Sequence, residues 1–105
     1  MTAAQQVLPE SVQVSCVVKP GDNFNPHERI RALGGLHHGQ RWKLSAEDII
    51  AEIEKPTYLR RWNFYTNVRG KNVWVIVAER NGRKYLKTQA DGSGENNLLH
   101  LPECP

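Results

Sequence analysis

The sequence has no apolar run long enough to cross a membrane. Its longest strongly apolar segment covers residues 73–78, whereas a membrane-spanning helix needs about 18 such residues. Residues 1–6 also lack the basic region and the apolar core of a secretory leader. We therefore expect a cytoplasmic protein that does not bind membranes.

Cysteine is scarce as well, because the sequence contains only Cys16 and Cys104. Two cysteines are too few for the disulfide framework of a small secreted domain. In a cytoplasmic protein we do not expect a disulfide between them, and we interpret Cys16 as a small core residue. The sequence itself leaves the redox state of the pair open.

The short motifs of common enzymes are missing. The sequence contains no phosphate-binding glycine loop, no nucleophile elbow and no His-Glu-x-x-His pattern. His38 and Asp91 are candidates for an acid–base pair, but nothing in the sequence brings their two loops together. We expect no enzymatic activity, no catalytic residue and no cofactor, and we keep catalysis as an alternative.

The histidines give little indication of a metal site. Zinc is usually held by four ligands at recurrent short spacings, whereas His37 and His38 are adjacent and His100 lies four residues before Cys104. We interpret His37 and His38 as solvated loop residues and expect no metal ligand. The alternative is a site drawn from the histidines and cysteines together: His27, His37, His38, His100, Cys16 and Cys104.

The remaining composition is that of one small globular domain. The 105 residues are 39% apolar and 24% charged, and 14 basic against 11 acidic residues give a net charge of +3. Nine of the basic residues lie within residues 55–87, where Glu79 is the single acidic residue. This basic segment predicts either an anionic partner such as nucleic acid or neutralisation by the acidic segments on both sides.

Alternating polar and apolar residues predict two strands before the helix. The first covers residues 12–18, and the second covers residues 29–33 and ends at the pair Gly34-Gly35. A loop follows over residues 36–40.

The strongest local pattern predicts a helix over residues 45–55. Ser45 can cap its first turn by accepting a hydrogen bond from the backbone N–H of Asp48, and Pro56 prevents its continuation. Its apolar residues recur at helical spacing and form one stripe: Ala46, Ile49, Ile50 and Ile53.

Three strands follow the helix, over residues 62–68, 73–78 and 83–88. Gly70 can form the turn of the first hairpin within residues 69–72, and Asn81-Gly82 is the strongest two-residue turn signal in the chain.

These turns predict the pairing of the strands. Ala78 should face Tyr85 in the second hairpin, and Val75 should face Thr66 in the first. Because side chains alternate across a strand, one face is apolar and should cover the helix: Trp62, Phe64, Val68, Val73, Val75, Val77 and Leu86. The opposite face carries mainly polar, basic and aromatic residues: Asn63, Tyr65, Asn67, Trp74, Ile76, Ala78, Arg80, Arg83, Tyr85 and Lys87.

These elements predict one α+β domain over residues 11–105, after a flexible N-terminus at residues 1–10. An antiparallel sheet, in the order β-β-α-β-β-β along the chain, packs on one short amphipathic helix.

The C-terminal third carries two distinctive segments, Tyr-Leu-x-Thr-x-x-Asp at residues 85–91 and Asn-Asn-Leu-Leu-x-Leu-Pro-x-Cys at residues 96–104. Both segments resemble a family of small bacterial domains of unknown function, with a looser similarity reaching back to residue 12. The resemblance implies a single compact domain and assigns no activity and no catalytic residue.

The tail has a physical interpretation of its own. Leu98, Leu99 and Leu101 need burial, so we expect them to fold back on the sheet or the helix. The alternative is a polar pocket lined by the polar residues of the same segment: Asp91, Asn96 and Asn97.

The polar and aromatic face is the candidate binding surface. Its candidate residues combine rings and cations: Tyr65, Trp74, Arg80, Arg83, Tyr85 and Lys87. Trp, Tyr and Arg dominate protein interfaces, so a protein partner or a second copy of the chain is the first expectation. Binding of single-stranded nucleic acid through the same face is the alternative, because rings stack on bases and cations hold phosphates.

Overall fold

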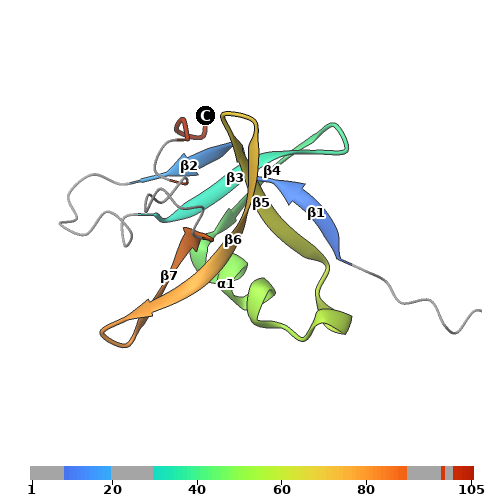
Figure 1. Ribbon diagram of the computed structural model, residues 1–105. Helices are drawn as coiled ribbons and strands as arrows, with labels where there is room; N and C mark the ends of the chain where they lie inside the picture. Colours follow the sequence, from blue (N-terminus) through green and yellow to red (C-terminus); the bar gives the residue numbers. More distant parts are fainter. Residues whose placement is uncertain (1–8, 20–29, 90–97, 99–100) are drawn as a thin grey trace, which may run out of the picture.

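The computed structural model describes residues 9–19, 30–89, 98 and 101–105 (Figure 1). Its elements follow one another along the chain: β1 (Glu10–Gln13), β2 (Cys16–Val18), β3 (Ala32–His37), β4 (Gln40–Ser45), α1 (Ala46–Glu54), a 3-10 helix η2 (Thr57–Leu59), β5 (Trp62–Val68), β6 (Lys71–Arg80) and β7 (Arg83–Thr88). The predicted α+β class is confirmed. Within the described residues, no helix is long and apolar enough to cross a bilayer.

The strands form two sheets. The first has the order β1-β5-β6-β7 and the second β2-β3-β4. All neighbouring strands are antiparallel except β1 and β5, which are parallel. Helix α1 packs against β4 and against β5, β6 and β7 of the first sheet (Figure 1).

The prediction of a single strand over residues 12–18 is wrong, because the chain changes sheets within it. The backbone N–H of Val14 donates to Tyr65 in the first sheet (2.8 Å), and that of Ser15 donates to Gly34 in the second (2.9 Å). Val12 and Val14 are both buried, but the next buried residue is Val17. The period of two is therefore broken where the chain crosses between the sheets.

The prediction that the pair Gly34-Gly35 ends a strand is wrong, because the pair lies buried within β3. A Cβ on Gly34 would lie 2.7 Å from the carbonyl oxygen of Trp42, and one on Gly35 would lie 2.6 Å from that of Gln13. Only glycine allows the backbones to approach so closely. The strand continues to His37, so the loop expected at residues 36–40 is instead a tight hairpin between β3 and β4.

The predicted helix and its cap are confirmed. The side-chain oxygen of Ser45 accepts from the backbone N–H of Asp48 at 3.1 Å. Ile49 is completely buried, and the other members of the stripe pack against the core as partly buried residues: Ala46, Ile50 and Ile53.

The carboxylate of Glu52 ties α1 to the start of β5. It accepts hydrogen bonds from Lys55 Nζ and from the backbone N–H groups of Arg61 and Trp62. Partial desolvation alone would raise the pKa of Glu52, but these hydrogen bonds outweigh desolvation and lower it below the ordinary value.

The register of the hairpin β6–β7 is as predicted, with Ala78 opposite Tyr85. The predicted register of β5–β6 is wrong by two residues, because Thr66 faces Val73 rather than Val75. Arg69 and Gly70 both have positive φ and form a two-residue turn, so the strands pair right up to that turn. A shift of two residues leaves every side chain on its predicted face.

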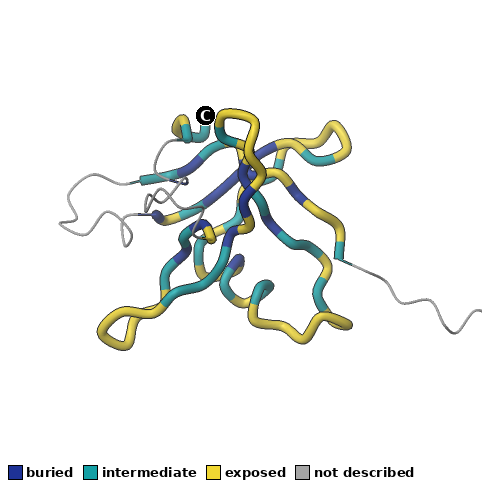
Figure 2. Tube along the Cα trace, viewed as in Figure 1, coloured by how far each residue is buried: buried dark blue, intermediate teal, exposed yellow. Residues whose placement is uncertain are grey.

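The inner face of the first sheet supplies much of the core. Its buried residues are Val12, Phe64, Thr66, Val73, Val75, Leu86 and Thr88. Figure 2 shows buried positions where the strands of the two sheets cross and exposed ones at the hairpin turns. The C-terminal leucines join this core as expected, since Leu98 is buried and Leu101 packs against it; Leu99 lies outside the described residues.

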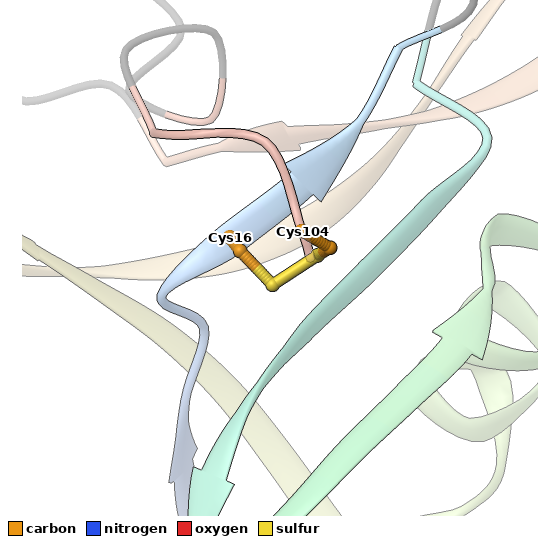
Figure 3. The surroundings of a disulfide bond; sticks show 2 residues. All are labelled: Cys16 and Cys104. Carbon is orange, nitrogen blue, oxygen red and sulfur yellow. A yellow bond between two sulfur atoms is a disulfide. The ribbon is translucent and has the colours of Figure 1, made fainter.

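A disulfide between Cys16 and Cys104 fixes the C-terminal segment to β2 (Figure 3). The backbone N–H of Val17 donates to Pro102 at 2.9 Å, and that of Cys104 donates to Val17 at 3.1 Å. This pairing corrects the expectation that the two cysteines are not bonded to each other. It could not be anticipated from a separation of 88 residues, because the fold alone brings the two positions together.

Candidate functional site

The outer face of the first sheet is the side turned away from the core. Register and burial place all six predicted site residues on it: Tyr65, Trp74, Arg80, Arg83, Tyr85 and Lys87. Each is exposed or partly exposed. The remaining positions of this face carry serine, asparagine, glutamine, alanine and isoleucine.

Trp74 is the centre of the aromatic part of the outer face. Its side chain is 44% exposed, and it lies directly opposite Tyr65 in the register of β5 and β6. The two rings meet edge to face, with centroids 6.2 Å apart and planes at 80°. Together with Ser11 and Asn72 they line an open depression of about 320 Å³. A flat ring of a ligand can therefore reach the indole without any rearrangement of the core.

The basic part of the outer face follows β6 and β7 towards their turn. Arg80 lies directly opposite Arg83, and Lys87 lies opposite Ile76. No residue among those that the structure describes forms an ion pair with any of these three cations. From Trp74 to Arg80 the stripe runs for about 20 Å at the usual rise of a strand.

The outer face carries no carboxylate on any of its four strands. These strands contain two acidic residues, Glu10 and Glu79, and the register turns both towards the opposite side. The acidic helix α1 neutralises Lys84, on the inner side, through an ion pair with Glu54 at 2.7 Å. Among the residues that the structure describes, neutralisation by acidic side chains therefore does not extend to the outer cations.

The three residues suggested for a polar pocket in the tail cannot be placed at the outer face. Asp91, Asn96 and Asn97 lie outside the described residues, as do His27 and His100.

A second group of side chains joins the two sheets. Glu10 of β1 contacts both His37 and His38: the distance between its Oε2 and His37 Nε2 is 2.9 Å, and that between its Oε1 and His38 Nε2 is 3.2 Å. These hydrogen bonds lower the pKa of Glu10. The interpretation of His37 and His38 as solvated loop residues is thus wrong for His37, whose side chain is 17% exposed.

Sequence reasoning missed Glu10 as a partner of the histidines, because 27 residues separate it from His37. The ring of His37 also packs edge to face on Trp62, with centroids 5.5 Å apart. Glu10, His37 and His38 line a cavity of about 400 Å³ together with Arg41 and Trp42.

Comparison with known proteins gives a family and no function. Residues 13–102 match the family described as "Protein of unknown function (DUF3892)". No curated protein and no solved structure matches the chain.

Proposed function

Because the chain belongs to the DUF3892 family, whose function is unknown, we propose its function from the surface itself: the outer face binds single-stranded nucleic acid. The protein acts by binding and not by catalysis. The observation that supports this proposal is the combination of three aromatic residues and three cations on a sheet face to which the four described strands turn no carboxylate.

Each part of the outer face suits one part of such a ligand. Aromatic side chains stack on unpaired bases with a contribution of about 1–3 kcal/mol per base, and Trp74 presents the most exposed ring of the face. The cations of β6 and β7 can hold the phosphates. An open sheet surface with stacking rings is also a common platform for single strands.

The arginine pair favours an anionic ligand. Like charges directly opposite each other on two strands destabilise the pairing, and Arg80 and Arg83 are such a pair. A phosphate between the two guanidinium groups would turn this repulsion into two charge-assisted hydrogen-bonding contacts.

The second candidate function is a protein-interaction module, which the exposed indole of Trp74 favours. The three cations of the outer face favour an acidic surface on such a partner. Self-association is favoured only in a two-fold contact that keeps the cations of one copy away from those of the other.

The test is fluorescence anisotropy with a labelled 15-nucleotide oligothymidylate and its RNA equivalent. Trp74→Ala should weaken binding by about 5- to 150-fold, the value of one stacked base. Tyr58→Ala is the matched control, because Tyr58 is 79% exposed in η2, away from the outer face. Equal affinity of the two variants, or no binding by the wild type, would refute the proposal. Binding of an acidic protein but not of the oligonucleotides would establish the second candidate.

Salt dependence measures the phosphate contacts. Three cations that each neutralise one phosphate of a single strand give a slope of log affinity against log salt of about −2. The affinity should then fall by roughly 20-fold between 50 and 200 mM salt. Arg83→Gln should make the slope shallower, whereas Arg31→Gln, an exposed arginine outside the outer face, should leave it unchanged.

The cellular location belongs to the proposal as well. A cytoplasmic protein would have access to nucleic acid, but the Cys16–Cys104 disulfide counts against this location, since thiols are kept reduced there. Alkylation of the thiols in intact cells, followed by mass spectrometry, decides the point. Two alkylated cysteines support a cytoplasmic location, and a protected pair excludes it for the mature protein.

A further inference from the structure

We propose that Glu10, His37 and His38 form a binding site for a divalent transition-metal ion, with Zn²⁺ as the best match. One ligand atom from each residue lies within 4.8 Å of the others. The site is separate from the outer face, and it connects the two sheets, since Glu10 belongs to β1 while His37 ends β3 and His38 follows it.

The backbone places two neighbouring histidines on one side, which an extended strand cannot do. His37 is the last residue of β3, and His38 begins the turn with a φ of 53°. Gly39 completes this turn with a φ of 78°. The positive φ of His38 turns its ring towards that of His37, so that the ring centroids lie 4.0 Å apart and both Nε2 atoms reach the carboxylate of Glu10.

The ligands and their spacing suit zinc. Zinc binds imidazole nitrogen and carboxylate oxygen at about 2.0–2.2 Å, and a tetrahedral site then separates neighbouring ligand atoms by about 3.3 Å. The nitrogen–oxygen distances from Glu10 are 2.9 Å to His37 and 3.2 Å to His38. These two distances involve different oxygens of the carboxylate, and the ligand atoms of the three residues spread over up to 4.8 Å. Binding of the ion therefore requires the exposed side chains to move by about 1.5 Å, from 4.8 Å to the tetrahedral spacing. Two imidazoles and one carboxylate form the ligand set of several open zinc sites.

The site is open to solvent, and its three protein ligands leave one coordination position of a zinc ion free. The side chains of Glu10 and His38 are 54% and 73% exposed, so an ion can enter from solvent. Three protein ligands leave a fourth position for water or another small ligand. The three residues also line a cavity of about 400 Å³ together with Arg41 and Trp42, so an exchangeable ligand has space there.

The test is calorimetric titration of the untagged full chain with Zn²⁺ in non-reducing buffer, so that Cys16 and Cys104 remain joined. One ion per chain should bind. His38→Ala and Glu10→Gln should each weaken binding by about tenfold or more, because even the loss of a residue that only orients a ligand costs about 10- to 100-fold. Both residues are exposed, so these variants should fold, which thermal unfolding without metal will check. The controls are His27→Ala and His100→Ala, which should bind Zn²⁺ as the wild type does.

A second probe reports on the place and geometry of the site. Co²⁺ in a tetrahedral site absorbs visible light strongly, and it quenches nearby indoles. We expect a saturable visible absorption and quenching of tryptophan fluorescence, because the ring of His37 lies 5.5 Å from that of Trp62.

Absence of saturable Zn²⁺ binding, or equal affinity in His38→Ala and in the wild type, would overturn the site. If a control variant loses Zn²⁺ binding while Glu10→Gln keeps it, the ion binds elsewhere, and this result would also overturn the site. Trp74→Ala should bind Zn²⁺ normally, so failure of this proposal and failure of nucleic-acid binding are distinguishable.

Discussion

Replacement of both cysteines by serine should remove a large part of the stability of the fold. The disulfide joins residues 88 positions apart, so in the unfolded chain it closes a loop that spans most of the sequence. The loop-closure model gives a loss of about 4.6 kcal/mol for a loop of this length, and measured losses for small domains are about 2–5 kcal/mol. Small domains have a total unfolding free energy of only about 5–15 kcal/mol.

The assay is urea denaturation of the wild type and of the Cys16→Ser/Cys104→Ser variant. The free energy of unfolding should fall by about 2–5 kcal/mol. The dependence of the unfolding free energy on urea concentration should become steeper, because the unfolded state without the cross-link exposes more surface. Addition of a reductant should lower the stability of the wild type to that of the variant and leave the variant unchanged.

A loss below about 0.5 kcal/mol with an unchanged slope would refute this reasoning, since it would mean that the cross-link does not restrict the unfolded chain. Binding of oligonucleotides should be the same in the variant, because the disulfide lies in the second sheet and not on the outer face.

Two other predictions concern the interior and the helix. Phe64→Ala should lower the unfolding free energy by about 3–5 kcal/mol, as deletions of buried aromatic rings do, whereas Trp74→Ala should cost under about 1 kcal/mol; equal losses by urea denaturation would mean that Trp74 is a core residue. Glu52 has a lowered pKa in the folded state, so its contribution is complete above the ordinary value of 4.5 and is lost as the pH falls through the folded pKa. The stability advantage of the wild type over Glu52→Gln should therefore shrink below about pH 4.5, and an advantage that grows on acidification would contradict the interaction of Glu52 with Lys55 and β5.

The parts of the fold that could be predicted are those encoded in short segments. The cap at Ser45, the isoleucine stripe and the Asn81-Gly82 turn each rest on a few neighbouring residues. The faces of β5, β6 and β7 could be assigned because alternation survives a register error of two residues, and the error at Thr66 was of that kind.

The missed features depend on contacts between distant segments. The change of sheet after Val14 and the burial of Gly34-Gly35 in β3 follow from how the two sheets cross, which the local sequence encodes only weakly. The group formed by Glu10 with His37 joins β1 of the first sheet to β3 of the second, a contact between strands far apart in the sequence. A change in the phase of buried valines, from Val14 to Val17, was the one signal in the sequence that pointed to the crossing.

The most direct test of nucleic-acid binding is a map of the contact surface by NMR. An isotope-labelled chain is titrated with the 15-nucleotide oligothymidylate, and the shifts of the backbone amides and of the three indole N–H groups are followed. We expect changes at the indole of Trp74 and at the amides of β5, β6 and β7, with Trp42 and the amides of β3 and β4 unaffected. Changes confined to the second sheet, or a Trp74 indole signal that does not move at saturation, would contradict the account.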